Sequence, residues 1–464
     1  MVFMADAAAA GEWRITPSFG VSETFTDNVD LTQDGRSDFI TTLNPGLSVR
    51  GTGARAHLNL DYKPSVLIFA KDSGRSDFQQ TLSGTGQVEL YEDVFFVDAS
   101  ASITQALISS TSATSASGVT DTNNRTDQRT VSLSPFIRHH LGSWADIENR
   151  YTFTQSSSGG GGIDNTLTNQ FTSTTRSGSR FQVLSWTLLA DASTTDRPGS
   201  SRTDNRATAR ADFQYAFNRL FSALFGLGYE VVNDDTLTSN VNGLTWNIGF
   251  LATPGPRSSV RITYGRRFGA DNLSMDASYK ITTRTSVRAQ FTQTITTTQR
   301  LDSTALGNLS VDANGAIINT QTGLPFTGDN SGFGLTDSAV RQDRFSIVLN
   351  GTRGRNTFNV QGFWEKRNTD ATGVDEKILG VTAQFSRRLT RKLSANLTTT
   401  YRYDDFGTSD GRREHEIQFN GSLSYNLYRN VSGSLAYFRS VRSSSLGGTS
   451  FTENGVTVSL QAQF

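Results

Sequence analysis

The sequence has no cysteine and few of the other residues that bind metals or carry out catalysis. Its 464 residues include no Cys and only 4 His. Lack of Cys suits a compartment in which an unpaired thiol is a liability, such as the route through the periplasm. The Cys and His spacings typical of metal sites are absent, and no fixed cluster places His beside Asp or Ser in a catalytic pattern. We therefore expect no catalytic, cofactor or metal site, and no enzyme.

Long apolar runs and an excess of charge are missing as well. Nowhere do about 18 apolar residues follow one another, which excludes a bundle of transmembrane helices. The mean hydropathy is −0.38, yet 10% of the residues are aromatic, which excludes a disordered chain. With 43 basic and 43 acidic residues the formal net charge is zero, so we expect no nucleic-acid partner.

The pattern that is present alternates between apolar and polar residues. From Trp13 onward, apolar residues at 15, 17, 19, 21 and 25 are separated by polar ones. Successive side chains of a strand point to opposite faces, so such a segment has one apolar and one polar face. In a transmembrane barrel the apolar face contacts lipid and the polar face lines the lumen. The alternation returns along the chain, for example at residues 56–63, 207–215, 273–279, 393–401 and 417–425.

Connections between these segments alternate in length. Tight turns are expected near 51–53, 91–93, 142–144, 218–219, 282–284, 353–355 and 429–430. Longer polar loops are expected at 27–37, 107–129, 156–166, 195–205, 232–242, 297–342, 368–375, 404–412 and 443–450. Short periplasmic turns and long extracellular loops are typical of outer-membrane barrels. The sequence therefore predicts an all-β fold, a single antiparallel up-and-down barrel of about 22 strands (20–24) with both termini in the periplasm.

The two ends of the chain fit this interpretation. Residues 1–10 have the small-residue end of a secretory signal, with cleavage expected near Ala8 to Ala10, so we expect 1–10 to be a signal-peptide remnant and 11–464 the barrel. The last nine residues alternate and finish on Phe464. This ending resembles the signal that the barrel assembly machinery of the outer membrane recognises.

Two segments resemble a known family. Residues 13–18 (Trp-Arg-Ile-Thr-Pro-Ser) with 22–29, and residues 264–269 (Tyr-Gly-Arg-Arg-Phe-Gly) continuing to Tyr279, resemble the outer-membrane proteins associated with PEP-CTERM systems, which look like relatives of the beta-barrel porin 2 family. The resemblance implies a passive conduit in exopolysaccharide export, and it brings no catalytic residues. A general diffusion porin for small solutes and a structural sheath or attachment barrel around a partner remain as alternatives. The expected partners are outer-membrane lipid and lipopolysaccharide, the assembly machinery and polysaccharide-export proteins.

Alternation also predicts which charged side chains face the lumen. The pore-lining set is Asp61, Lys63, Asp98, Arg138, Glu148, Arg150, Arg210, Asp212, Arg261, Asp276, Lys280, Arg288, Glu365 and Arg402. One interpretation is that these charges pair across strands and keep the wall solvated. The other is that they form a track for a sugar polymer, with Arg donating paired hydrogen bonds to carboxylates.

The longest loop is the candidate for narrowing the lumen. Barrels of this width usually carry a plug, and only about a dozen residues precede the first strand. Residues 297–342 include Leu324-Pro325-Phe326 and Phe333, apolar residues that a solvated loop does not need. We hypothesise that this loop folds inward as a constriction; the alternative is a mobile external loop.

Overall fold

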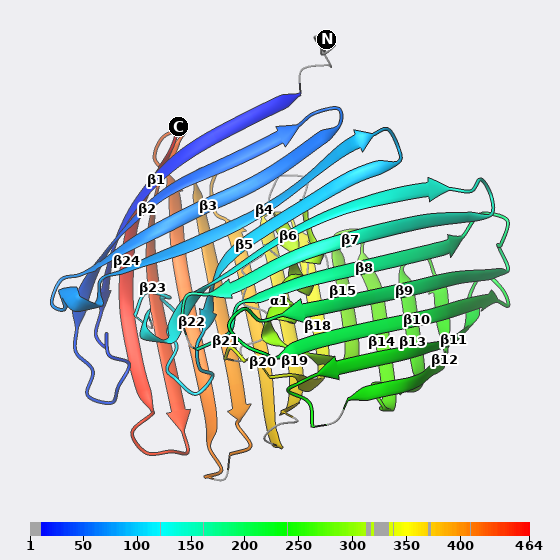
Figure 1. Ribbon diagram of the computed structural model, residues 1–464. Coiled ribbons are helices and arrows are strands. Elements are labelled where there is room, and N and C mark those ends of the chain that lie inside the picture. The colour runs from blue at the N-terminus through cyan, green and yellow to red at the C-terminus, as the bar shows by residue number, and fades with distance from the viewer. Residues whose placement is uncertain are drawn as a thin grey trace.

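The chain forms one closed antiparallel barrel of 22 strands (Figure 1). The computed structural model describes residues 11–120, 122–160, 162–238, 240–311, 317–319, 334–336, 338–369, 373–408 and 410–464. The predicted fold class is confirmed.

Each of the 22 barrel strands pairs with the barrel strands before and after it in the sequence, and the last pairs with the first. The first half of the barrel contains β1 (Glu12–Thr26), β2 (Asp38–Thr52), β3 (Ala56–Phe69), β4 (Asp77–Tyr91), β5 (Phe95–Leu107), β6 (Arg125–His140), β7 (Ala145–Ser158), β8 (Thr166–Ser177), β9 (Leu184–Asp196), β10 (Thr203–Ala216) and β11 (Phe221–Asp234). The second half contains β12 (Val241–Gly255), β13 (Ser258–Arg267), β14 (Ala270–Thr282), β15 (Thr285–Thr296), β18 (Val340–Arg353), β19 (Asn356–Thr369), β20 (Val374–Arg388), β21 (Leu393–Asp405), β22 (Arg413–Asn426), β23 (Val431–Ser444) and β24 (Phe451–Gln463).

The shorter elements lie between these strands. They are η1 (Ser73–Arg75), η2 (Thr122–Asn124), α1 (Thr298–Gly307) and the two-stranded sheet of β16 (Leu309–Val311) and β17 (Ile317–Asn319). Among the described residues, no helix has the length and apolar character needed to cross a membrane.

Pairing of β1 with β24 closes the barrel. The register runs from Ser18 opposite Gln463 to Thr26 opposite Gly455. The backbone N–H of Phe464 extends it by donating to the carbonyl of Pro17 at 2.9 Å. Because β24 is paired on both sides, the sheet has no open edge, which is what a membrane-spanning sheet requires.

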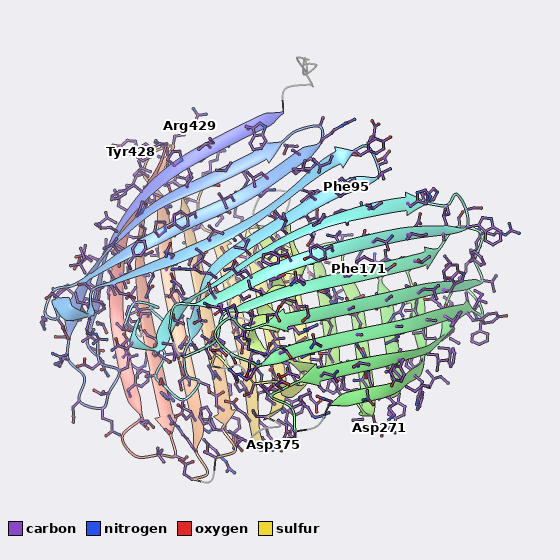
Figure 2. All side chains as sticks on the ribbon, in the orientation of Figure 1. Phe95, Phe171, Asp271, Asp375, Tyr428 and Arg429 are labelled. Carbon is purple, nitrogen blue, oxygen red and sulfur yellow. The ribbon has the colours of Figure 1, made fainter. Side chains whose placement is uncertain are left out.

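The period-two pattern of the sequence separates the two faces of the wall. Large apolar side chains are exposed on the outside, among them Ile15 at 64% and Ile248 at 60%. Phe171, 48% exposed, lies on the outward face of β8 (Figure 2). The polar residues between them face inward, as the alternation predicts.

The two ends of the barrel differ in their connections. At one end, ten turns of two to six residues join the strands, at 53–55, 92–94, 141–144, 178–183, 217–220, 256–257, 283–284, 354–355, 389–392 and 427–430. At the other end, which we call the loop end, the connections include 27–37, 108–124 and 297–339. Two loop-end connections, 70–76 and 268–269, are missing from the predicted loops; the second has only two residues and does not stand out from a turn.

At the loop end, loops cover apolar residues of the inner wall. Ile40, Leu67 and Phe69 face inward at the loop end and are at most 2% exposed, packed with Val29 of loop 27–37 and Val119 of loop 108–124. A second cluster joins Val232, Val241 and Ile295 to Ala339 in the same way. Burying this surface favours loops folded against the wall.

A glycine near the closing seam provides a test of the packing. A Cβ at Gly455 would lie 2.2 Å from the ring of Phe438 and 2.4 Å from the backbone oxygen of Phe25. We expect Gly455→Val to destabilise the barrel by about 1–3 kcal/mol, the usual effect of overpacking. Urea unfolding followed by heat-modifiable migration measures this. Gly447→Ala, whose Cβ would have no atom within 4 Å, is the control, and equal stability of both variants would contradict the prediction.

Candidate functional site in the barrel lumen

The predicted pore-lining residues of the first strands are paired with one another or with neighbours. Arg50 of β2 donates to Asp61 of β3 at 2.6 Å. Arg150 of β7 donates to Asp98 of β5 at 2.7 Å, and also to Glu148 at 3.1 Å.

Two arginines of this region lie on aromatic rings. Arg138 donates to Glu148 at 3.1 Å, with its guanidinium carbon 4.9 Å from the centre of the Phe136 ring. The guanidinium carbon of Arg150 is 3.8 Å from the same ring. Ring stacking and ion pairing together hold each guanidinium in one orientation.

Ion pairs also form among the remaining predicted residues. Pairs spaced two residues apart on one strand join Arg210 to Asp212 at 2.6 Å and Arg402 to Asp404 at 2.8 Å. Arg288 pairs across strands with Asp276 at 2.6 Å. Glu365 pairs with both Arg344 and Arg367. Arg261 donates to the side-chain oxygen of Gln214 at 3.5 Å. Lys63 and Lys280 occupy inward register positions on β3 and β14. The ion pairs favour a solvated wall of matched charges; a role of these residues in transport stays a prediction.

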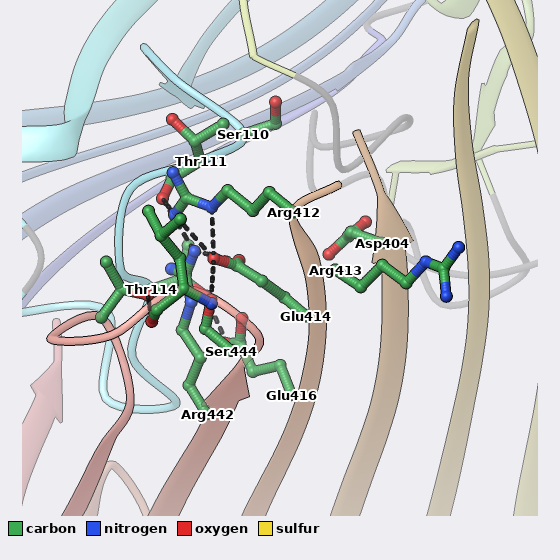
Figure 3. A network of polar contacts seen from close by, with 12 residues as sticks. Ser110, Thr111, Thr114, Asp404, Arg412, Arg413, Glu414, Glu416, Arg442 and Ser444 are labelled. Carbon is green, nitrogen blue, oxygen red and sulfur yellow. Dashed lines mark hydrogen bonds and ion pairs between the residues drawn. The ribbon is translucent and has the colours of Figure 1, made fainter. Parts of the chain in front are cut away.

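Loop 108–124, one of the long loops predicted from the sequence, folds into the lumen. It leaves β5 and reaches the inner faces of β20, β22, β23 and β24, although β1–β4 separate β5 from β24 along the wall. Ser110 donates to Glu376 of β20 at 3.0 Å. Thr114 donates to Glu416 of β22 (Figure 3).

A buried ion-pair network holds the start of this loop. Glu414 of β22 pairs with Arg412 at 2.6 Å and with Arg442 of β23. Both arginines also donate to the backbone carbonyl of Thr111, at 2.5 and 2.7 Å (Figure 3). Since Glu414 and Arg442 are only 2% and 3% exposed, the loop carbonyl completes a desolvated charge network.

A second carboxylate holds the end of the loop through hydroxyl groups. Glu453 of β24 is fully buried and accepts hydrogen bonds from Ser115 at 2.5 Å, Thr120 at 2.9 Å and Thr26 at 3.0 Å. The backbone N–H of Ala116 donates to the hydroxyl of Ser440 at 2.8 Å. Loop 108–124 is therefore hydrogen-bonded across the loop end of the barrel.

The helix α1 lies inside the barrel (Figure 1). Thr297 caps its N-terminus by accepting the N–H of Arg300 at 3.3 Å. The side chain of Arg300 reaches Asp204 at 3.5 Å and Ser193 at 3.2 Å on the wall. Burial, followed by the nearby charge of Arg206, lowers the pKa of Arg300 to about 10, so the guanidinium is charged at neutral pH.

Two cavities flank α1, which agrees with the predicted inward position of the loop that begins at 297. One, of about 460 Å³, separates Leu301, Thr304 and Ala305 from the inner wall of β13–β19. The other, of about 670 Å³, separates the wall of β3–β8 from Leu306 and Leu309. The residues 324–326 and Phe333, which motivated the hypothesis, lie outside the described residues, and gating stays a prediction.

The residues that anchor loop 108–124 were not identified from the sequence. Glu414, Glu416, Arg442 and Glu453 have the inward parity of their strands, as do other charged residues that contact water. A usable signal was the apolar residue on the polar face, such as Phe69, 2% exposed, which ends β3 at the loop end and packs with Val119 of the loop. An inward apolar side chain indicates that something covers it.

The comparisons with known proteins agree with this architecture. Residues 360–464 match a family model described as "Putative beta-barrel porin 2". Among solved structures, the siderophore receptor PirA from Acinetobacter baumannii is 8% identical, with a TM-score of 0.51 over 97% of this chain and 80% of that chain. The open form of the ferric-catecholate import receptor Fiu from E. coli K12 is 11% identical, with a TM-score of 0.50 over 96% and 81%. None of the curated proteins matches the sequence.

At these identities the two receptors show a shared fold alone. Taken with the closed 22-stranded sheet and the family match, they place the protein in the class of bacterial outer-membrane β-barrels. The match over β20–β24 supports a porin-type channel.

The network around Glu414 predicts how loop 108–124 can be released. We expect Arg442→Met to remove the bonds to Glu414 and to the Thr111 carbonyl, a loss of about 1–3 kcal/mol for hydrogen bonds to a charged group. Hydrogen–deuterium exchange in residues 108–120 should then accelerate by roughly tenfold or more. The same substitution at Arg439, exposed on the outer face of β23, is the matched control. Unchanged exchange in the Arg442 variant would rule out the network as the anchor.

Proposed function

We propose that this barrel is a passive conduit for exopolysaccharide export across the outer membrane. The observation that carries the proposal is the composition of the lumen. Most of the residues that line the cavities beside α1 carry amide, hydroxyl or guanidinium groups, which suit a polymer rich in hydroxyl groups.

The paired charges of the wall also suit passive passage. A wall of matched ion pairs stays hydrated and holds no strong net charge that would trap a moving polymer, because tight binding slows release. The resemblance of residues 13–29 and 264–279 to proteins of PEP-CTERM systems supports the same context. In this proposal the chain has no catalytic role; lipopolysaccharide and the barrel assembly machinery are its membrane partners, and polysaccharide-export proteins dock at its short-turn end.

A general diffusion porin is the second candidate, favoured by the description of the family that matches residues 360–464. A porin would let small neutral solutes swell proteoliposomes at rates set by solute size. A conduit closed by its loops would not let these solutes pass, so the proteoliposomes would not swell.

Deletion of the gene in the producing bacterium tests the export function directly. We expect extracellular polysaccharide to fall to background while polymer accumulates in the cell, because the conduit is the outer-membrane exit. Sugar analysis of culture medium and cell fractions measures both quantities, and complementation with the intact gene should restore secretion. Normal secretion in the deletion strain would contradict the proposal.

The position of α1 predicts the effect of removing it. We expect replacement of residues 298–338 by a short Gly-Ser linker to increase single-channel conductance in planar bilayers, because α1 fills part of the lumen. A replacement of the exposed loop 445–450 by the same linker is the control. Equal conductance of the two variants would show that α1 does not limit passage.

A further inference from the structure

The cavity between α1 and the wall of β13–β19 has the character of an anion site. Three arginines line it: Arg267 of β13, Arg288 of β15 and Arg344 of β18. Among the described residues that line it, none is acidic. The guanidinium groups are thus nearer to the cavity than the carboxylates that balance them.

Arg344 is held in place by the groups behind it. It donates to Glu365, a carboxylate with no exposed surface, and its guanidinium carbon lies 4.6 Å from the centre of the Phe363 ring. Fixing a guanidinium in this way lowers the entropy lost when it binds a ligand.

The other two arginines are also paired on one side and open on the other. Arg288 uses Nε and one terminal nitrogen on Asp276, at 3.2 and 2.6 Å, and Arg267 pairs with the buried Glu230 at 3.3 Å. The side chains of Arg288 and Arg267 are each 40% exposed. Each can therefore donate further hydrogen bonds toward the cavity.

Amide side chains fill the spaces between the arginines. Gln290 donates to Asp276 at 2.7 Å and Gln342 donates to Glu365, so each amide has its oxygen left to accept. Gln361 and Asn308 add two more amides from opposite sides of the cavity. Groups that both donate and accept match neighbouring hydroxyls, each of which does the same.

We infer that this cavity binds acidic saccharide units, that is, sugars carrying a carboxylate. The arginines would take the carboxylate in paired hydrogen bonds and the amides would take the ring hydroxyls. The inference rests on the proposed export function and gives its substrate a chemical class. A neutral sugar would leave the arginines without their ligand, and a simple anion would leave the amides without theirs.

Isothermal titration calorimetry of the purified full-length barrel in detergent tests this without requiring an open channel. The probes are trigalacturonate, the neutral trisaccharide maltotriose and inorganic phosphate. We expect trigalacturonate alone to bind. The double variant Arg288→Gln/Asp276→Asn, which leaves the net charge unchanged, should bind it roughly tenfold or more weakly, since hydrogen bonds to charged groups are among the strong ones.

Two further variants keep the result interpretable. Ser346→Trp fills the cavity without altering a charged group, and it should also abolish binding. Arg55→Gln/Glu92→Gln removes an exposed pair of 2.8 Å at the short-turn end and should bind as the unaltered protein does. Heat-modifiable migration shows that each variant has folded.

The outcomes separate this site from the export function. Absence of trigalacturonate binding, equal binding of maltotriose or phosphate, or unweakened binding in the folded cavity variants would each overturn the inference. Binding combined with normal secretion in the deletion strain would leave the site standing and refute export. Loss of secretion in the deletion strain combined with no trigalacturonate binding would support export and refute the binding site.

Discussion

The structure depends on the satisfaction of every backbone hydrogen bond within the bilayer. A sheet in lipid cannot leave an edge unpaired, because each exposed N–H or C=O group would cost several kcal/mol. The pairing of β1 with β24 removes that edge, and an even number of strands follows for a barrel whose two termini lie at the same end. In such a closed wall, apolar side chains must face the lipid outside and polar side chains must face the lumen.

Polar groups, and not an apolar core, hold the loops inside the barrel. The two apolar clusters at the loop end are small, whereas Glu414, Glu453 and Asp204 are each almost fully buried among hydrogen-bond donors. Removing donors from a buried carboxylate is strongly unfavourable, so the bonds of Ser115 and Thr120 to Glu453 oppose the departure of loop 108–124 from the wall. This makes the loop positions specific even though little apolar surface is buried.

The period-two alternation of the sequence was enough to predict the barrel strands but not the segments that fold into the lumen. Alternation around Trp13 and in residues 207–215 predicted the strands, their faces and the approximate strand number, because a strand has only two faces. Loop 108–124 has no such period: its Ser and Thr residues are equally compatible with an external loop. Its place depends on contacts with Glu416 and Glu453, more than 300 residues away in the sequence, which no local pattern records.

The chemistry of those contacts is compatible with the proposed passage of a polysaccharide. Loop 108–124 satisfies Glu416 with the hydroxyl of Thr114 and Glu453 with the hydroxyls of Ser115 and Thr120. A polymer rich in hydroxyl groups offers the same kind of donor, so it can replace the loop without leaving a carboxylate unpaired. An apolar solute cannot, because displacing the loop would then carry the full desolvation cost of the buried charge. In the proposed conduit, the groups that hold loop 108–124 would thus favour hydroxyl-bearing substrates over apolar ones.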